Sequence, residues 1–461
     1  MSDLHVVILA AGKGTRMKSS RPKVLHRVAG RPMIGYVLRT AAALSPKTTT
    51  LVVGHMQETL RDGLKEHSGL QFAQQEPQLG TGHALLQTAP VLEHQRGIVL
   101  LLSGDAPLIR SRTLAELVTK HKQSGAAATV LTAVFDQPYG YGRIVRVGDK
   151  IARIVEERDA SPAERKIKEI NSGIFAFSLG PLFDALRGLA AGNAQGEYYL
   201  TDLVAAFRRQ GLGVETVVLA DPNEIRGING RSELAEASRI VRQKKNEELM
   251  AAGVTIEDPA TTYIDDDVVV GADTVIHPGV HLEGSTRIGM ACELHSGVRI
   301  VDSVLADRVT VRNFCVIQGS RLGSDVTVGP FAHLRQDSDL HASVHVGNFV
   351  ELKKAVLGAG SKAGHLSYLG DATIGERVNV GAGTITCNYD GERKHQTVIE
   401  DGAFIGSDTQ LVAPVTIGRG AYVGTGTTIR EDVPAGALAV SAGKQRNIQD
   451  WTQKRKREKG T

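Results

Sequence analysis

The second half of the chain carries an aliphatic residue at every sixth position, and this repeat limits the possible folds more than any other feature. An α-helix repeats every 3.6 residues and an amphipathic strand every two, so neither explains it. A solenoid with one inward aliphatic side chain on each flat face explains the six-residue repeat. The alternative, an irregular β-sandwich, is not favoured because its strands would show period two. The repeating positions are Ile264, Val270, Ile276, Leu282, Ile288, Leu294 and Ile300, then Val316, Leu322, Val328 and Leu334, then Val346 and Leu352, and finally Ile399, Ile405, Leu411, Ile417, Val423 and Ile429.

The first 228 or so residues show a different pattern, in which short Val/Ile/Leu runs alternate with helical periodicity. This alternation predicts βαβ units and a mostly parallel sheet. Gly148-Asp149 between two apolar runs predicts a hairpin. A polar helix over 232–252 is expected to connect the two halves. The expected strands are 6–9, 51–53, 98–102, 144–147 and 151–155, and the expected helices of this half are 33–43, 83–92 and 111–122.

Composition narrows the class of protein. With 461 residues the chain exceeds one ordinary core, and 41% apolar and 23% charged residues argue against disorder and against a membrane protein. The 51 glycines and the 4% aromatic content indicate many tight turns and small aliphatic cores. Cys292, Cys315 and Cys387 form no C-x-x-C pair, which favours a reducing compartment. The apolar run 6–11 is too short for a signal or a span, so we expect a cytoplasmic protein without membrane insertion.

The net charge of +4 lies in the C-terminal tail. A basic chain can indicate a nucleic-acid partner, but the body that remains is neutral, so we expect none. The tail after Trp451 is expected to be solvated and mobile. Its basic residues are Lys454, Arg455, Lys456, Arg457 and Lys459, and Glu458 cancels one of their five positive charges.

The first expected strand runs into the sequence LAAGKGTR at 9–16. It lacks the glycine spacing of a P-loop, and Met17 stands where a dinucleotide fingerprint needs its third glycine. A glycine-rich turn with many backbone N–H donors, near Lys13, Arg16 and Lys23, suits a triphosphate.

The same run, with Pro22-Lys23 downstream, resembles the nucleotidyltransferases that join an NTP to a sugar 1-phosphate. The match extends through QLGTGHA at 78–84, GYGRI at 140–144, EINSG at 169–173 and QGEYY at 195–199. With KAGHLSYLGD at 362–371 and GAGTITCNYDG at 381–391, the whole chain resembles the bacterial bifunctional family of glucosamine-1-phosphate N-acetyltransferases and N-acetylglucosamine-1-phosphate uridyltransferases. The resemblance implies a Rossmann-like α/β uridyltransferase domain over 1–229, a helical linker over 230–252 and an acetyltransferase domain over 253–461, a left-handed parallel β-helix with a basic tail.

For the uridyltransferase half, the resemblance implies binding sites for UTP and N-acetylglucosamine 1-phosphate. The turn from Leu9 through Ala10 and Ala11 to Gly12 would hold the nucleotide, with Ser103 and Gly104 beside it. Arg16 and Lys23 would face the phosphates. The residues assigned to uracil are Gln75, Gly80 and Thr81, and those assigned to the sugar are Gly142, Glu156 and Asn171.

A magnesium ion is expected in this half. Asp105 follows an apolar strand, at the edge of an α/β sheet where ligands bind. Mg²⁺ prefers hard oxygen ligands and keeps several waters, so one carboxylate, one amide oxygen and substrate phosphates are sufficient. The resemblance assigns the protein ligands to Asp105 and Asn229.

For the acetyltransferase half, acyl transfer from a thioester to an amine needs a proton acceptor, and histidine suits neutral pH. The resemblance makes His365 this general base. Arg335 and Lys353 would bind the phosphate of glucosamine 1-phosphate, and Tyr368 and Asn379 its sugar. The positions that match acetyl-CoA contacts are Ala382, Asn388, Tyr389, Ser407, Thr425 and Ala442, with Lys444 or Arg446 as alternative sources of the arginine charge often found at Ala442.

The family places the acetyltransferase site where subunits meet, so we expect a homotrimer. Two other functions remain open. One is a nucleotidyltransferase whose β-helix serves only for oligomerisation, and His365 with the Asn388-Tyr389 loop argues against it. The other is a non-catalytic scaffold, which would leave the phosphate-binding motifs unexplained.

Overall fold

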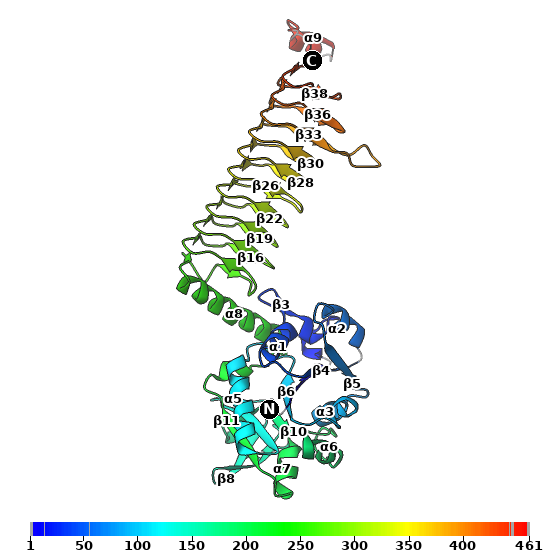
Figure 1. Cartoon of the computed structure of the whole chain (residues 1–461), viewed down its shortest axis with the longest axis vertical. Coiled ribbons are helices and arrows are strands. Elements are labelled where there is room, and N and C mark those ends of the chain that lie inside the picture. Colours follow the sequence, from blue (N-terminus) through cyan, green and yellow to red (C-terminus); the bar gives the residue numbers. More distant parts are fainter. Residues whose placement is uncertain (1–2, 13, 55, 442, 444–446, 459–461) are drawn as a thin grey trace. The chain divides into compact units, whose positions relative to one another are not determined.

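The computed structural model describes residues 3–12, 14–54, 56–441, 443 and 447–458. These residues form two compact units, Met1–Val241 and Arg242–Thr461, and the division falls inside helix α8 (Arg231–Ala251). Figure 1 shows an α/β unit and a long stack of short strands. The domain bounds expected from the sequence, at 229/230 and 252/253, are not tested by this division and remain a prediction.

The first unit is built on a mixed sheet in the order β11-β7-β10-β6-β1-β4-β5. Only β10 runs antiparallel to its two neighbours on this path through the described residues, so the sheet is mostly parallel, as expected. The expected hairpin is confirmed as β8 and β9. The strands are β1 (Leu4–Leu9), β4 (Thr48–Val53), β5 (Leu70–Gln74), β6 (Ile98–Ser103), β7 (Ala128–Val134), β8 (Arg143–Val147), β9 (Lys150–Val155), β10 (Glu169–Ser178) and β11 (Val214–Val218).

Helices cover both faces of this sheet, because its strands are apolar on both sides. In β1, Val6 and Ile8 join one core and Val7 joins the other. Central strands of α/β proteins read as continuous apolar runs for this reason. The helices on the first face are α1 (Met33–Ala42), α2 (Gln57–Gly63) and α5 (Ser111–Ser124), and those on the second are α3 (Thr81–Leu86), α4 (Ala89–Leu92), α6 (Leu179–Arg187) and α7 (Asp202–Arg209).

The second unit is a parallel β-helix with three flat faces. One face is a continuous sheet from β12 (Thr255–Ile256) to β39 (Leu438–Ala439), and a second sheet folds over the other two faces. His281 pairs with Arg299, 18 residues on, and Arg299 pairs with Val316, 17 residues on, so one coil takes about three hexapeptides. The repeated strands lie parallel to one another along the stack (Figure 1).

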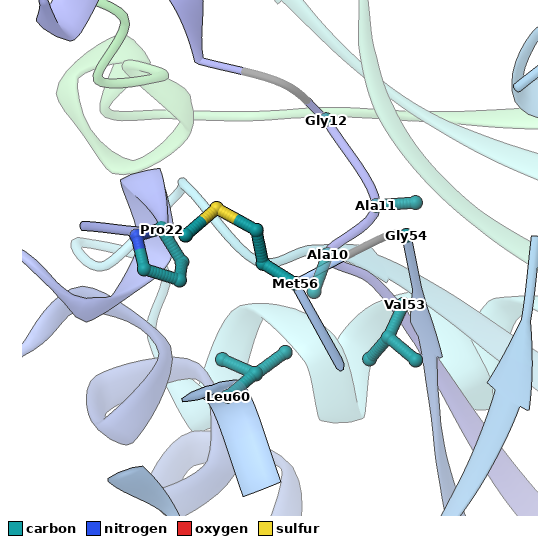
Figure 2. A pocket seen from close by; sticks show the side chains of 8 residues that line it. All are labelled: Ala10, Ala11, Gly12, Pro22, Val53, Gly54, Met56 and Leu60. Carbon is teal, nitrogen blue, oxygen red and sulfur yellow. The ribbon is translucent and has the colours of Figure 1, made fainter. Parts of the chain in front are cut away.

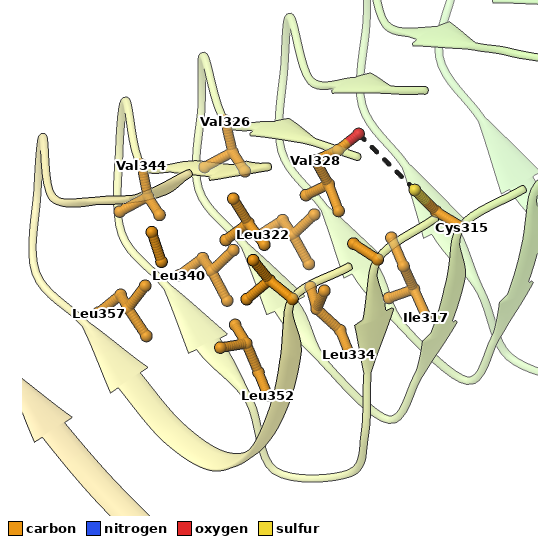
Figure 3. Packing of buried hydrophobic residues seen from close by; sticks show 14 of the residues in the cluster. Cys315, Ile317, Leu322, Val326, Val328, Leu334, Leu340, Val344, Leu352 and Leu357 are labelled. Carbon is orange, nitrogen blue, oxygen red and sulfur yellow. Dashed lines mark hydrogen bonds between the residues drawn. The ribbon is translucent and has the colours of Figure 1, made fainter. Parts of the chain in front are cut away.

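The core of the β-helix is a column of aliphatic side chains, shown in part in Figure 3. The expected inward residues are buried with one exception. Val316 is only partly buried, whereas Ile317 is fully buried in β22 (Val316–Gln318). Since coils of 17 residues shorten one of the three turns, the six-residue period slips by one position there.

Helix α8 does more than connect the two halves. Its first part packs Ala237 into a small core with Val28 and Met33 of the first unit. In its second part, Leu249 joins the β-helix core, and buried Asn246 donates a hydrogen bond to Pro259 O at 3.0 Å. The second part is therefore a cover for the first coil, which its polar sequence did not indicate.

The C-terminal tail forms helix α9 (Trp451–Glu458), where the sequence favoured a mobile segment. The range 451–458 holds no glycine or proline and several strong helix formers, which accounts for the helix. Among the described residues, none of the helices combines the length and the apolar character that a membrane span requires.

Candidate active sites

The glycine-rich turn after β1 is fixed at the carboxyl ends of three parallel strands. Ala10 N donates to Val52 O at 2.8 Å, and Leu9 O accepts from Gly104 N at 3.0 Å. Gln78 Nε2 donates to Ala11 O at 2.5 Å. The turn therefore lies at the sheet edge where α/β proteins bind ligands.

A pocket opens beside this turn, and Figure 2 shows the side chains that line it. The side chains that line it are apolar, so backbone groups of the turn are the polar groups that a nucleotide would meet there. Arg16 is exposed in the 3-10 helix Thr15–Met17, and Lys13 lies outside the described residues. The lining residues are Ala10, Ala11, Gly12, Pro22, Val53, Gly54, Met56 and Leu60.

Lys23, Asp105 and Asn229 meet at one point although they are far apart in sequence. Lys23 Nζ forms an ion pair with Asp105 Oδ2 and donates to Asn229 Oδ1 at 3.2 Å. Ser103 Oγ donates to the other carboxylate oxygen, Asp105 Oδ1, at 2.6 Å. Asp105 O accepts from Ile228 N at 3.0 Å, which places Asn229 beside the carboxylate. A carboxylate oxygen and an amide oxygen thus converge on the Lys23 ammonium group. The expected Mg²⁺ site requires the same pair of oxygen ligands close together.

The residues expected at uracil lie together around the start of α3. Buried Gln75 donates through Nε2 to Gly80 O at 2.9 Å. Thr81 Oγ1 accepts from Leu200 N at 3.2 Å. Gly80 has φ 103°, and a Cβ there would come within 2.8 Å of Tyr198 O, so the close approach of the two chain segments requires glycine.

The three residues expected at the sugar are also neighbours. Asn171 N donates to Gly142 O at 2.9 Å, and the Glu156 carboxylate lies 3.3 Å from the place a Gly142 Cβ would take. Thr201 Oγ1 donates to Glu156 Oε1 at 3.0 Å. Burial, and then the nearby charges of Asp159 and Asp202, raise the pKa of Glu156. Its carboxyl group is thus a strong acceptor for a ligand hydroxyl in a partly desolvated site.

In the β-helix, four of the expected residues stack at one corner of successive coils. Strand pairing aligns Ala363 with Val380, Val380 with Ile405 and Ile405 with Val423, and each of these residues is followed by glycine. The residue after each glycine stands at the corner. The column consists of His365, Ala382, Ser407 and Thr425, and the next expected residue, Ala442, lies outside the described residues along with Lys444 and Arg446.

His365 is exposed and held by a residue that sequence reasoning missed. Its Nδ1 lies 2.5 Å from Asn348 Oδ1, one coil earlier. With an amide oxygen facing Nδ1, this nitrogen carries the proton, and Nε2 keeps its lone pair for the substrate. The signal was present in the sequence, because Asn348 follows Gly347 as His365 follows Gly364, 17 residues on.

A group of cations lies at a different corner. Lys353 pairs in the sheet with Gly370, and Arg335 is held by Glu351, with Nη1 to Oε1 at 2.9 Å. The pKa of Lys353 is lowered by its hydrogen bond to Lys394, and further by the charges of Lys394 and Arg335. Sequence reasoning missed Lys394, which comes from an insertion outside the hexapeptide repeat.

Tyr368 and Asn388 lie close to this cation group. A Cβ at Gly370 would meet both the Tyr368 hydroxyl and Asn388 Nδ2, so the two side chains cross above this glycine. Asn388 Nδ2 also donates to Asp371 Oδ2 at 2.5 Å. Tyr389 is exposed at the start of the inserted loop.

Asn379 is not brought to the other sugar residue. It lies in β31 (Asn379–Val380), on the face that runs from β12 to β39, whereas Tyr368 lies in β30 (Tyr368–Ile374) of the other sheet. One chain therefore presents the expected acetyltransferase residues as separate groups on different faces.

Comparison with known protein families gives matches in both halves of the chain. The family models that match are the MobA-like NTP transferase domain at residues 6–170, the GMPPB C-terminal domain at 260–357 and the bacterial transferase hexapeptide (six repeats) at 396–431. The hexapeptide match supports the left-handed form of the parallel β-helix.

Curated relatives extend the match to full length. The bifunctional protein GlmU of Syntrophotalea carbinolica is 53% identical over 97% of both chains. Those of Trichlorobacter lovleyi and Geobacter sulfurreducens are 51% and 50% identical, each over 98% of both chains. The family resemblance in the sequence is therefore confirmed, and the chain belongs to the bifunctional GlmU family.

Proposed function

We propose that the chain is a bifunctional enzyme of UDP-N-acetylglucosamine synthesis. It acetylates glucosamine 1-phosphate with acetyl-CoA on the β-helix, then transfers UMP from UTP to N-acetylglucosamine 1-phosphate in the α/β unit. The observation that carries this proposal is the presence, in one chain, of the Lys23–Asp105–Asn229 cluster and the His365–Asn348 hydrogen bond. A nucleotidyltransferase with a merely oligomerising β-helix is not favoured, because the relatives are named bifunctional over the full length.

In uridylyl transfer, a phosphate oxygen of the sugar phosphate attacks the α-phosphorus of UTP, and pyrophosphate leaves. Catalysis is positioning and charge neutralisation, without covalent protein chemistry. Arg16 and Lys23 would face the phosphates. Asp105 and Asn229 would hold Mg²⁺, which supplies positive charge for the phosphates when bound. The residues that would bind the nucleotide are Leu9, Ala10, Ala11, Gly12, Gln75, Gly80, Thr81, Ser103 and Gly104, and those for the sugar are Gly142, Glu156 and Asn171.

In acetyl transfer, the amine of glucosamine 1-phosphate attacks the thioester carbonyl, and the CoA thiol leaves. His365 Nε2 accepts the amine proton, while Asn348 holds the ring through Nδ1 as a positioning residue. Positive charge at Arg335, Lys353 and Lys394 would bind the phosphate. The remaining assignments are Tyr368 and Asn379 to the sugar, and Ala382, Asn388, Tyr389, Ser407 and Thr425 to acetyl-CoA.

An exposed apolar stripe supports the homotrimer. Phe314, Phe331, Phe349 and Leu366 stand on successive coils with 56%, 48%, 55% and 61% of their surface exposed. The rings stack at 5.4 and 5.5 Å between centroids, and all four residues have positive φ, between 51° and 59°. Bulky residues rarely adopt this conformation, and exposed apolar rows mark interaction surfaces.

The stripe also passes next to the acetyltransferase residues, because Phe349 follows Asn348 and Leu366 follows His365. A second copy against this stripe would therefore meet the first chain beside His365. We place the assembled enzyme in the cytoplasm, in line with its substrates.

The test is a pair of substitutions assayed for both reactions. His365→Ala should abolish acetyl transfer, a loss of about 100-fold or more, and spare uridylyl transfer from supplied N-acetylglucosamine 1-phosphate. Asp105→Ala should do the reverse. His341→Ala, an exposed histidine of the same β-helix, is the matched control and should retain both reactions. If either active-site change disabled both reactions in a folded protein, the two-site assignment would be wrong.

A further inference from the structure

A group of side chains of metal-ligating types lies on the β-helix, several coils before the strand that carries His365. His277 follows β15 (Val275–Ile276), and His295 follows β18 (Glu293–Leu294), which pairs with β15 in register. The two imidazoles stack with centroids 4.7 Å apart and planes 6° apart. Glu293 precedes His295 by two residues and therefore projects from the same side of its strand.

The ligand atoms of these three residues converge. His277 Nε2 and His295 Nε2 each lie 3.4 Å from the same oxygen, Glu293 Oε1. Tetrahedral coordination with metal–ligand bonds of about 2.0–2.1 Å separates ligand atoms by about 3.3–3.4 Å. Two edges of the coordination polyhedron are thus already formed. All three atoms lie within 4.8 Å of one another, and the third edge, between the two imidazoles, forms when the stacked rings rotate out of their parallel arrangement so that both Nε2 lone pairs point at the ion.

A fourth residue fits the outer coordination shell. Glu257 Oε2 lies 3.0 Å from His277 Nδ1, the nitrogen that faces away from Glu293. A metal-bound histidine usually donates its other N–H to a carboxylate, which fixes the tautomer and the ring orientation. The carboxylates of Glu257 and Glu293 together also balance the charge of a divalent cation.

We propose that His277, His295 and Glu293 bind a divalent transition-metal ion of the zinc class, with Glu257 as the positioning residue for His277. Two imidazoles and one carboxylate favour Zn²⁺ over Mg²⁺ or Ca²⁺, which prefer all-oxygen sites. The ion joins the coils of β15 and β18, while Glu257, after β12, ties the preceding coil to them. In a solenoid each coil is stabilised by its neighbours, so a clip across the first coils strengthens the end of the stack.

The experiment uses the untagged full chain, stripped of metal with a chelator and titrated with Zn²⁺ by calorimetry. Wild type and His341→Ala should bind one more Zn²⁺ per chain than the double variant His277→Ala/His295→Ala. Zinc bound at Asp105 and Asn229 does not contribute to this difference, because all three proteins keep those two residues. Zn²⁺ should also raise the thermal midpoint of the wild type more than that of the double variant.

Glu257→Gln tests the positioning role, and it should weaken zinc binding by about tenfold without changing the stoichiometry. Both enzymatic activities should survive in every variant, which shows that each is folded. Equal zinc stoichiometry and affinity in the wild type and the double variant would overturn the proposal, as would a wild type that binds no zinc at micromolar concentration.

Discussion

The two candidate sites are built in different ways. In the α/β unit, Lys23, Asp105 and Asn229 come from distant parts of the chain and are already bonded to one another. In the β-helix, the expected residues stand in columns along the coils, and Asn379 and Tyr368 lie in different sheets. A parallel sheet gathers its strand ends at one edge, whereas a solenoid repeats the same corner along an axis.

The comparison shows whether one chain alone can bring all the residues of a site together. A sheet edge can close a site within one chain. A solenoid sets its residues in rows, and in the proposed assembly a second subunit would complete the site between rows. The two activities should therefore respond differently to dilution, to changes at the interface and to loss of internal contacts.

The largest effect is expected from Phe331→Glu, which places a charge in the middle of the exposed apolar stripe. It should weaken assembly by about 100-fold or more, because a buried charge without a partner replaces an aromatic contact. Light scattering should show dissociation, and acetyl transfer should fall with it while uridylyl transfer persists. Phe331→Leu, which keeps the site apolar, should remain assembled. An assembled and fully active Phe331→Glu protein would remove the contrast between the two sites.

A smaller effect concerns the internal contacts of the α/β unit. His121 is buried between α5 and the sheet, with Nδ1 2.9 Å from Thr129 Oγ1 and Nε2 3.1 Å from Ser178 Oγ. Burial lowers its pKa from 6.5 to about 4. Between these values the unfolded chain binds the proton and the folded chain does not, so this contribution to stability is present above pH 6.5 and is lost toward pH 4.

For His121 alone, the free energy of unfolding should fall by about 2 kcal/mol between pH 7.5 and pH 5. Calorimetry of the full chain should show this loss in the transition of the α/β unit. In His121→Gln, which does not titrate but can still form hydrogen bonds, the pH dependence of that transition should be flatter by this amount. An unchanged slope would mean that His121 is accessible to protons in the folded protein.

The smallest effect tests the cation group on the β-helix. Lys394→Met should raise the KM for glucosamine 1-phosphate by about tenfold and leave uridylyl transfer unchanged, because one charge-assisted hydrogen bond to the phosphate is lost. Arg393→Met removes the same charge from the neighbouring position of the loop and is the matched control. Equal changes in KM for both variants would indicate a general effect of charge rather than a specific contact.

The β-helix could be predicted closely from the sequence, because each hexapeptide obeys the same local rule. The error at Val316 arose where a coil has 17 residues rather than 18, a change that periodicity cannot locate to one position. Asn348 was accessible through the same repeat, once its coil is aligned with that of His365. Lys394 was not, since the inserted loop follows no period.

The structure of the α/β unit could be predicted from the sequence only in part. The apolar patterns predicted β1, β4, β6, β8 and β9 and helices α1 and α5, and the expected helix 83–92 is divided into α3 and α4. They did not predict strands β5, β7, β10 and β11 of the sheet or helices α2, α6 and α7. The convergence of Lys23, Asp105 and Asn229 depends on how the strands are ordered in the sheet, which local patterns do not encode. The sequence pattern indicated Lys23 beside the glycine-rich turn and Asp105 at the end of a strand, whereas only the family resemblance indicated Asn229, and the roles of all three in binding stay predictions.

The second part of α8 limits how the protein can be divided. A solenoid has an open end wherever its repeats begin, and a polar cover must close it for the stack to stay soluble. Here Leu249 and Asn246 belong to that cover. An isolated β-helix must therefore keep residues 242–251, so that the connector of the two enzymes is at the same time the end cap of one of them.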